Sequence, residues 1–283
     1  MNVKRRDFLK IAGISAIAGI GAPSALHMLL KDDDNASSEA GHEPKAPGNE
    51  PKAHGGGHEA APTGIQLGMV VDVRKFDENK ALAAKCVEAC HLTHNVPEFP
   101  NAKDAIKWVW IEDFEHLFTQ HNQYAQVKGL PFLTLCNHCA NPPCVRACPT
   151  KATFKAKDGN IIMDYHRCIG CRFCMAACPY GARSFNWRDP REKDAGGNLK
   201  FIKKLNPDYP TRMRGVVEKC NFCAERVDKG QKPACVEACG DSKALIFGNI
   251  NDSNSEIAQV LKTTFTIQRK QELGTKPSLF YII

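Results

Sequence analysis

The chain has 283 residues, of which 43% are hydrophobic and 24% are charged, and its formal net charge is +7. This is the composition of an ordinary globular protein with one large or two small domains. The basic residues form no aromatic-studded stripe, which argues against nucleic-acid binding, and a solvated basic surface accounts for them more simply than docking to an acidic partner or an anionic membrane. Fourteen cysteines at short spacings are unusual, and they indicate metal sites rather than scattered disulfides.

Residues 1–30 resemble a twin-arginine (Tat) export signal. The pair Arg5-Arg6 lies in a basic start and is followed by an apolar stretch over 11–30. About 20 apolar residues are enough for a membrane-spanning helix, but glycines and Pro23 interrupt this stretch and favour a cleaved signal. An uncleaved signal acting as an anchor stays open. Because the twin-arginine route carries folded proteins, as the behaviour of that signal family implies, metal clusters can be inserted before export.

Residues 31–63 are predicted to be a disordered linker. The segment is acidic and rich in proline and glycine, and it cannot bury a core. His42, His54 and His58 are possible metal ligands, but scattered histidines in such a tract are usually solvated.

The folded part is expected over 64–250, followed by a tail over 251–283 that packs on the core or on a partner. Several stretches have the composition of strands, and Asp158-Gly159 between two of them is a hairpin signal. Residues 188–219 are polar, and we expect a long surface excursion there. The expected strands cover residues 68–73, 108–111, 152–155, 160–164, 184–187 and 244–248.

Two four-cysteine runs organise the centre of the sequence. The second run has the spacing Cys-x2-Cys-x2-Cys-x3-Cys-Pro, which is the bacterial ferredoxin run for a [4Fe-4S] cluster. In paired runs, three closely spaced thiolates hold one cluster and the fourth reaches across to the other cluster. The runs therefore predict two crossed ligand sets. The first group is Cys136, Cys139, Cys144 and Cys178, and the second group is Cys168, Cys171, Cys174 and Cys148.

The outer cysteines predict a third set by the same rule. The expected first run has kept only Cys86 and Cys90, because Lys80 and Ala83 occupy the two preceding positions. Two thiolates do not hold a four-iron cluster, so Cys86 and Cys239 are left over and are expected to lie close together. Three alternatives are open for this pair: buried thiols, a disulfide, or ligands of an atypical centre. The third group is Cys90, Cys220, Cys223 and Cys235, which makes three [4Fe-4S] clusters.

Structural zinc and a disulfide framework are the alternatives to iron–sulfur clusters. Zinc uses separated Cys-x2-Cys knuckles and has no use for the x3-Cys-Pro ending, so iron–sulfur is favoured. Asn137, His138 and Asn141 lie beside the first central run and are candidates for tuning a cluster potential, with loop capping as the alternative.

A separate trio of His116, Phe118 and His121 is expected to be surface and core, because no cysteine or carboxylate cluster joins it. No catalytic residue is expected, since the sequence offers no Ser–His–Asp set, phosphate loop or convincing pair of acids.

With these runs in place, the chain resembles the ferredoxin-type electron-transfer subunits of polysulfide, formate-dependent nitrite and dimethyl sulfoxide reductases. The resemblance covers about 64–283. Within this family, the signal, the gapped first run and the sequences 167–180 and 183–190 are similar to one branch. It comprises the periplasmic iron–sulfur subunits of the membrane redox complex linked to dissimilatory sulfite reductase (Dsr complex, subunit O).

The resemblance implies an α+β fold of two pseudo-symmetric ferredoxin-like units in one body. It also implies an electron conduit, rather than an enzyme, between an integral-membrane quinone-interacting subunit and a cytochrome or catalytic redox subunit. The setting would be anaerobic sulfur-type respiration on the extracytoplasmic face of the membrane. The alternatives are an electron-transfer subunit of a molybdopterin-dependent reductase, an enzyme acting alone on a sulfur compound, and a scaffold whose metal only holds the fold.

Overall fold

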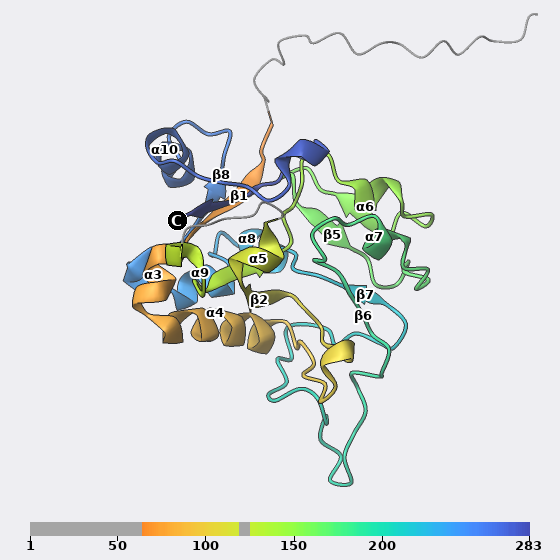
Figure 1. The fold of residues 1–283 in the computed structure, drawn as a ribbon. Coiled ribbons are helices and arrows are strands. Elements are labelled where there is room, and N and C mark those ends of the chain that lie inside the picture. Colours follow the sequence, from red (N-terminus) through yellow and green to blue (C-terminus); the bar gives the residue numbers. More distant parts are fainter. Residues whose placement is uncertain (1–63, 119–124) are drawn as a thin grey trace, which may run out of the picture. The chain divides into compact units, whose positions relative to one another are not determined.

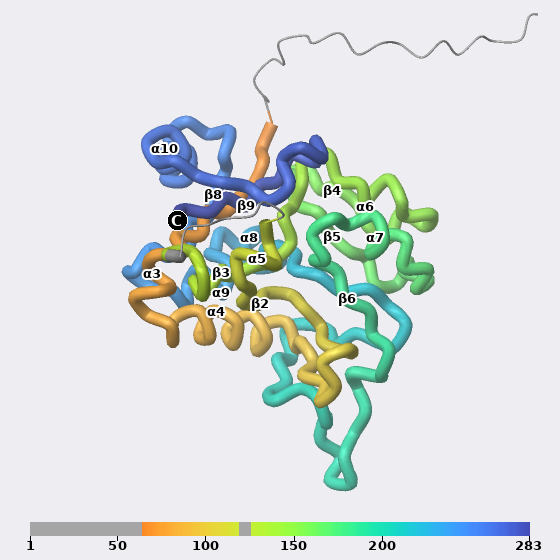
Figure 2. Tube along the Cα trace, viewed as in Figure 1, coloured from red at the N-terminus to blue at the C-terminus, as the bar shows by residue number. Residues whose placement is uncertain are grey.

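The computed structural model describes residues 64–118 and 125–283, which belong to one compact unit (Figures 1 and 2). The expected export signal, the linker with its three histidines, and His121 lie outside the described residues.

Short strands form four small sheets, a mixed α/β arrangement in which no sheet exceeds three strands among the described residues. The strand order is β8-β1-β9 in the largest sheet, and the pairs β2-β3, β4-β5 and β6-β7 are two-stranded and antiparallel. The strands are β1 (Leu67–Asp72), β2 (Val109–Glu112), β3 (Phe132–Leu135), β4 (Thr153–Lys155), β5 (Ile161–Met163), β6 (Ser184–Phe185), β7 (Val217–Glu218), β8 (Leu245–Asn249) and β9 (Leu279–Ile282).

The helices are short apart from one on the side of the molecule opposite α6 and α7 (Figure 1). That helix, α4, packs on α9 and β2. The α-helices are α3 (Val73–Glu78), α4 (Lys80–Thr93), α5 (Phe114–Leu117), α6 (Pro143–Arg146), α7 (Phe173–Ala176), α8 (Ala224–Val227), α9 (Ala234–Ala238) and α10 (Glu256–Thr263). Single 3-10 turns lie at Ala102–Asp104, Ala125–Val127, Gly240–Ser242 and Gln271–Leu273.

The central strand β1 shows how the core is divided. All six of its residues are buried, and because successive side chains of a strand face opposite sides, Met69 and Val71 join the main core while Val70 packs with Ile257 of α10. Strand β9 pairs parallel to β1 and β8 pairs antiparallel to it. The end of the C-terminal tail therefore packs on the core as a sheet strand.

The hairpin signal at Asp158-Gly159 is confirmed, since β4 and β5 flank it and pair antiparallel. Gly159 has φ +83°, and a Cβ there would overlap the side chain of Gln66. The strand expected over 108–111 corresponds to β2, which pairs with β3, a strand that the sequence did not predict.

The surface excursion expected over 188–219 is wrong at Arg212 and at its last residues, 216–219. Residues 191–198 are exposed, but Arg212 and the segment 216–219 are buried. The polar composition is misleading because the buried charges are paired: the Arg212 Nε lies 2.7 Å from the Glu218 carboxylate. Across the described part of the chain, no helix combines the length and apolarity needed to span a membrane.

Candidate metal centres

Three cysteine runs share one local structure, a turn followed by a short helix. In each, the third cysteine is the second residue of the helix, as Cys144 in α6, Cys174 in α7 and Cys235 in α9. In each, the residue before the second cysteine has positive φ, +39° at His138, +71° at Gly170 and +55° at Phe222. Left-handed residues within such turns bring backbone N–H groups into concave, anion-binding arrangements, which suits thiolates.

The cysteines of the first group lie near one another. Burial raises the pKa of the Cys139 thiol, and its neighbours Cys136, Cys144 and Cys178 act in the same direction, so that the pKa reaches about 12. These four thiols come from two separate runs of the sequence, and the tertiary structure brings them near one another.

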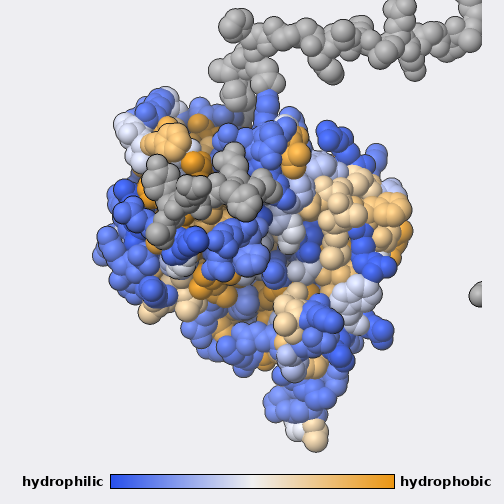
Figure 3. All heavy atoms as spheres, in the orientation of Figure 1, coloured by the Kyte–Doolittle hydropathy of each residue, from blue (hydrophilic) through white to orange (hydrophobic). Residues whose placement is uncertain are grey.

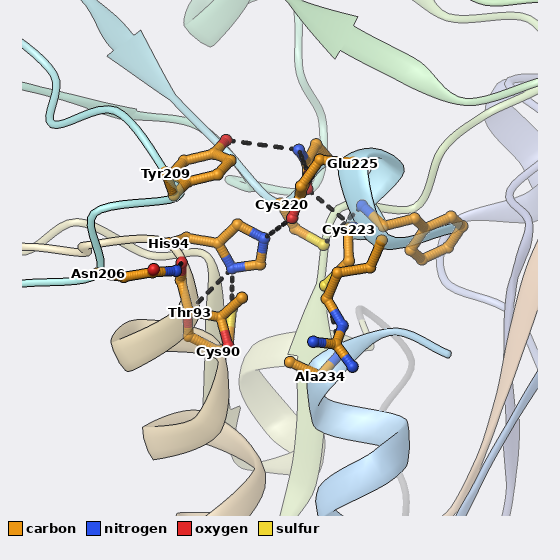
Figure 4. Close-up of polar contacts among 12 residues, drawn as sticks. Cys90, Thr93, His94, Asn206, Tyr209, Cys220, Cys223, Glu225 and Ala234 are labelled. Carbon is orange, nitrogen blue, oxygen red and sulfur yellow. Dashed lines mark hydrogen bonds and ion pairs between the residues drawn. The ribbon is translucent and has the colours of Figure 1, made fainter. Parts of the chain in front are cut away.

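The third group gathers around the long helix. Burial raises the pKa of Cys90, on α4, and the thiols of Cys220, Cys223 and Cys235 contribute in the same direction. All four are buried. Figure 4 shows Cys90 on its helix opposite Cys220 and Cys223 on their loop.

The second group lies nearest the surface. Its members Cys148, Cys168, Cys171 and Cys174 line one small cavity. Only Cys174 is fully buried, and the other three are half-buried.

The groups follow one another in space, and two buried cations mark the gaps between them. Burial lowers the pKa of Arg183, but the thiols of Cys144 and Cys174 raise it. Arg183 therefore lies near thiols of both the first and the second group. Its Nη1 donates to Thr153 Oγ1 at 3.1 Å. Its Nη2 is buried and has no hydrogen-bond partner among the described residues.

Lys219 lies near thiols of the first and third groups. Burial lowers its pKa, while Cys136 of the first group and Cys220 of the third oppose that effect. Its Nζ donates to the carbonyls of Cys220, at 2.7 Å, and Ile161. The first group is therefore the middle one, with the second and third groups at either end.

The leftover cysteines do lie together, which confirms that expectation. The Sγ atoms of Cys86 and Cys239 are 3.0 Å apart and buried. Cys86 precedes Cys90 by one turn of α4, and Cys239 follows Cys235 by one turn at the end of α9, so the pair lies one helical turn beyond the third group. Among the described residues, no third His, Cys, Asp or Glu ligand atom lies within 4.8 Å of both sulfurs.

Backbone N–H groups reach two sulfurs of the third group. Phe222 N donates to Cys220 Sγ at 3.4 Å, and Ala234 N donates to Cys223 Sγ at 3.3 Å. Hydrogen bonds to sulfur are one of the means by which proteins set the potential of a cluster.

His94 is a buried residue of this site that the sequence reading missed. Its Nε2 lies 2.8 Å from Glu225 Oε1 and its Nδ1 lies 3.0 Å from the Cys90 carbonyl oxygen (Figure 4). Burial lowers the pKa of His94, but Cys223 and Glu225 more than offset this and raise it to about 9. The sequence could have indicated His94, because it follows Cys90 by four residues and residues at this spacing lie on the same face of a helix.

The three candidates for tuning a cluster potential beside the first central run make different contacts. His138 is buried, its Nδ1 accepts from Ile161 N at 3.0 Å, and its Nε2 therefore donates to the Cys220 carbonyl at 3.1 Å. This ties two cysteine loops together, which is the capping role. Asn141 donates to the Gly274 carbonyl at 3.2 Å. Asn137 is buried, and its amide has no hydrogen-bond partner among the described residues.

His116 is accompanied by carboxylates, contrary to expectation. His116 Nδ1 lies 3.5 Å from Glu112 and 3.6 Å from Asp113. His116 and Asp113 are exposed and lie on the surface, as expected, while Phe118 packs on the core.

The donor sets fit four-iron clusters. Each group offers four cysteine sulfurs, the ligand number of a [4Fe-4S] cluster, and a bound metal favours the thiolate forms that burial alone disfavours. The unpartnered Nη2 of Arg183 and amide of Asn137 lie in the same region, where inorganic sulfides would supply acceptors.

Comparison with known proteins agrees with this chemistry. Residues 127–195 and 205–250 match the family model described as a 4Fe-4S dicluster domain. The chain is 46% identical over 204 residues to the Hdr-like menaquinol oxidoreductase iron-sulfur subunit 1 of Archaeoglobus fulgidus, covering 69% of this chain and 71% of that protein. It is 38% identical over 241 residues to the arsenate respiratory reductase iron-sulfur subunit of Shewanella, covering 77% and 96%.

A third relative is the iron-sulfur cluster-binding subunit of the menaquinone reductase of Nitratidesulfovibrio vulgaris, 36% identical over 242 residues, covering 77% and 89%. The chain therefore belongs to the family of iron–sulfur subunits of oxidoreductase complexes. It is an electron-transfer subunit that carries [4Fe-4S] clusters in a ferredoxin-like domain.

Proposed function

We propose that this chain passes single electrons along three [4Fe-4S] clusters held by the three cysteine groups. The order runs from the second group, through the first, to the third. The single observation that carries the proposal is the gathering of twelve cysteines from distant runs into three sets of four, with the first set in the middle.

The protein's part is to hold the clusters and to set their surroundings. A four-iron cluster held by thiolates supplies one-electron redox chemistry. Packing around the third group excludes water, while the half-buried second group lets a partner approach. Arg183 keeps a positive charge between two groups, and a positive charge favours the more negative, reduced state of a nearby centre.

The proposed partners are an integral-membrane quinone-interacting subunit and a cytochrome or catalytic redox subunit. The names of two relatives, a menaquinol oxidoreductase subunit and a menaquinone reductase subunit, support a quinone-linked complex. The arginine pair at the start of the chain supports Tat export to the extracytoplasmic face. The resemblance to sulfite-reductase-linked complexes supports a role in anaerobic sulfur-type respiration.

A second candidate is an electron-transfer subunit of a molybdopterin-dependent reductase. It is favoured by the relatives named as arsenate respiratory reductase and putative dimethyl sulfoxide reductase subunits. Molybdenum analysis of the complex purified through this chain distinguishes the two candidates, because only the second requires the metal.

Iron and acid-labile sulfide counting tests the cluster number. Anaerobically purified protein should contain about twelve irons, three clusters of four. Cys90→Ala should lose about four of them, because it removes one thiolate of the third group. Cys86→Ala is the matched control one turn away on the same helix, and it should lose none.

Different counts would contradict the proposal in recognisable ways. Near sixteen irons, with a loss in Cys86→Ala, would make Cys86 and Cys239 ligands of a fourth centre. Zinc in place of iron, with a colourless protein, would leave only the scaffold function.

A further inference from the structure

The second group opens onto an exposed apolar face. Within the loop that carries Cys168, Cys171 and Cys174, the intervening residues Ile169 and Phe173 are 67% and 60% exposed. Figure 3 shows apolar residues gathered on the side of the molecule where Figure 1 places α6 and α7. Large exposed apolar side chains grouped in this way mark interaction sites.

Aromatic rings and an arginine extend this face. Trp187 is exposed, its ring lies 4.6 Å from that of Phe185, and the Arg172 guanidinium lies over it at 4.6 Å. A Cβ on Gly170 would lie 3.2 Å from the Phe185 ring, so the cysteine loop and this aromatic cluster are in contact. Aromatic residues and arginine are the types enriched in protein interfaces. We call Ile169, Arg172, Phe173, Phe185 and Trp187 the apolar face.

The surroundings of the apolar face are basic. Arg146 and Lys151 flank Cys148 of the second group, are exposed, and form no ion pair with any described residue. Across residues 140–188 the acidic residues are Asp158 and Asp164, and Asp164 is engaged by Arg167 at 3.2 Å. Acidic side chains are therefore scarce where cationic ones are free, and a partner with the complementary charge would be acidic.

We propose that the apolar face and its basic rim are the docking surface for an acidic redox protein that exchanges electrons with the second cluster. The inference rests on the proposed function and adds to it the exchange point and the charge of the partner. The second group is the least buried of the three. Because electron tunnelling falls steeply with distance, the end of the relay nearest the surface is the place where a partner's cofactor can come within range.

The test uses the full-length protein with its clusters and measures electron-transfer rates by stopped flow. The probes are an acidic plant-type ferredoxin and a basic cytochrome c. The double variant Arg146→Glu/Lys151→Glu should slow exchange with the ferredoxin by about tenfold or more at low salt, and the difference should shrink as salt screens it. The same variant should speed exchange with the basic cytochrome.

A matched control places two charge reversals elsewhere. Lys80→Glu/Lys262→Glu changes two exposed lysines on α4 and α10, on the other side of the molecule from α6 and α7 (Figure 1), and should change neither rate beyond twofold. Phe173→Glu should slow exchange with the ferredoxin at high salt as well, because it removes an apolar contact.

Several outcomes overturn the docking surface. Equal rates in the rim variant and the wild type do so, as does an equal effect of the control. Binding to phosphatidylglycerol vesicles that the rim variant loses, with ferredoxin rates unchanged, assigns the surface to a membrane instead. Iron counts and reduced-state EPR spectra are measured on every variant. Missing clusters in the wild type would refute the proposed function, whereas intact clusters with unchanged rates refute only the docking surface.

Discussion

Arg212 forms a buried ion pair with Glu218, and removing the charge of Arg212 should destabilise this protein more than removing any other charge. The two side chains are 1% and 0% exposed, and the atoms approach to 2.7 Å. Arg212 also donates to the carbonyls of Asn95, at 2.9 Å, and His94. The Arg212 guanidinium therefore connects the C-terminal part of the 188–219 segment to the residues that follow α4, beside the third group.

Removing Arg212 leaves a carboxylate in the core with reduced compensation. In the Arg212→Met variant, Glu218 keeps neutral donors, Trp108 Nε1 at 2.9 Å and Asn186 Nδ2 at 2.5 Å, but loses its counter-charge. Breaking a buried pair from one side costs about 3–5 kcal/mol. For a domain of this size, each kcal/mol lowers the melting temperature by about 2–4 °C, so the expected fall is about 6–20 °C.

The assay is thermal unfolding of the holoprotein, followed by circular dichroism and by bleaching of cluster absorbance. Lys243→Met is the control, because the Lys243–Glu256 pair has the same 2.7 Å separation but lies exposed on the surface. It should leave the melting temperature unchanged, since solvent screens exposed pairs. A fall of less than about 3 °C in Arg212→Met, half the lower estimate, would refute the reasoning.

Two further predictions concern charge beside the cysteine groups. Arg183→Gln should make the clusters of the first and second groups harder to reduce, while Arg183→Lys should not, because the cation lies near Cys144 and Cys174. An EPR-monitored redox titration measures the potentials, and a tenfold change in the equilibrium constant corresponds to about 59 mV. Unchanged potentials in the glutamine variant would contradict the prediction. His94 has a pKa of about 9, above its ordinary 6.5, so its charged form should add stability that is complete below pH 6.5 and is lost as pH rises through 9. The rate of cluster bleaching should accordingly rise between pH 7 and 10 in the wild type and less steeply in His94→Gln; equal pH profiles would show that His94 contributes nothing.

The cysteine groups were open to sequence reasoning because their chemistry is local. Three ligands of each group sit in one run, and the spacing that lets three thiolates surround one cluster is written in adjacent residues. The crossing fourth ligand is a prediction from the ferredoxin rule, and in the structure Cys178 lies near Cys139 while Cys90 lies near Cys220. The hairpin at Asp158-Gly159 was readable for the same reason, since a tight turn depends on its own residues.

The burial of charges was decided by the tertiary structure alone. Arg183, Arg212 and Lys219 carry charges of the kind that ordinarily lie in solvent, yet all three are buried. An arginine or lysine is buried only where distant residues supply acceptors or counter-charges, and the local sequence does not show those residues. The meeting of Cys86 with Cys239 depends in the same way on the packing of α4 against α9. The amino-acid sequence by itself thus determined what the protein can bind, while long-range packing determined the order of the sites and the charges that surround them.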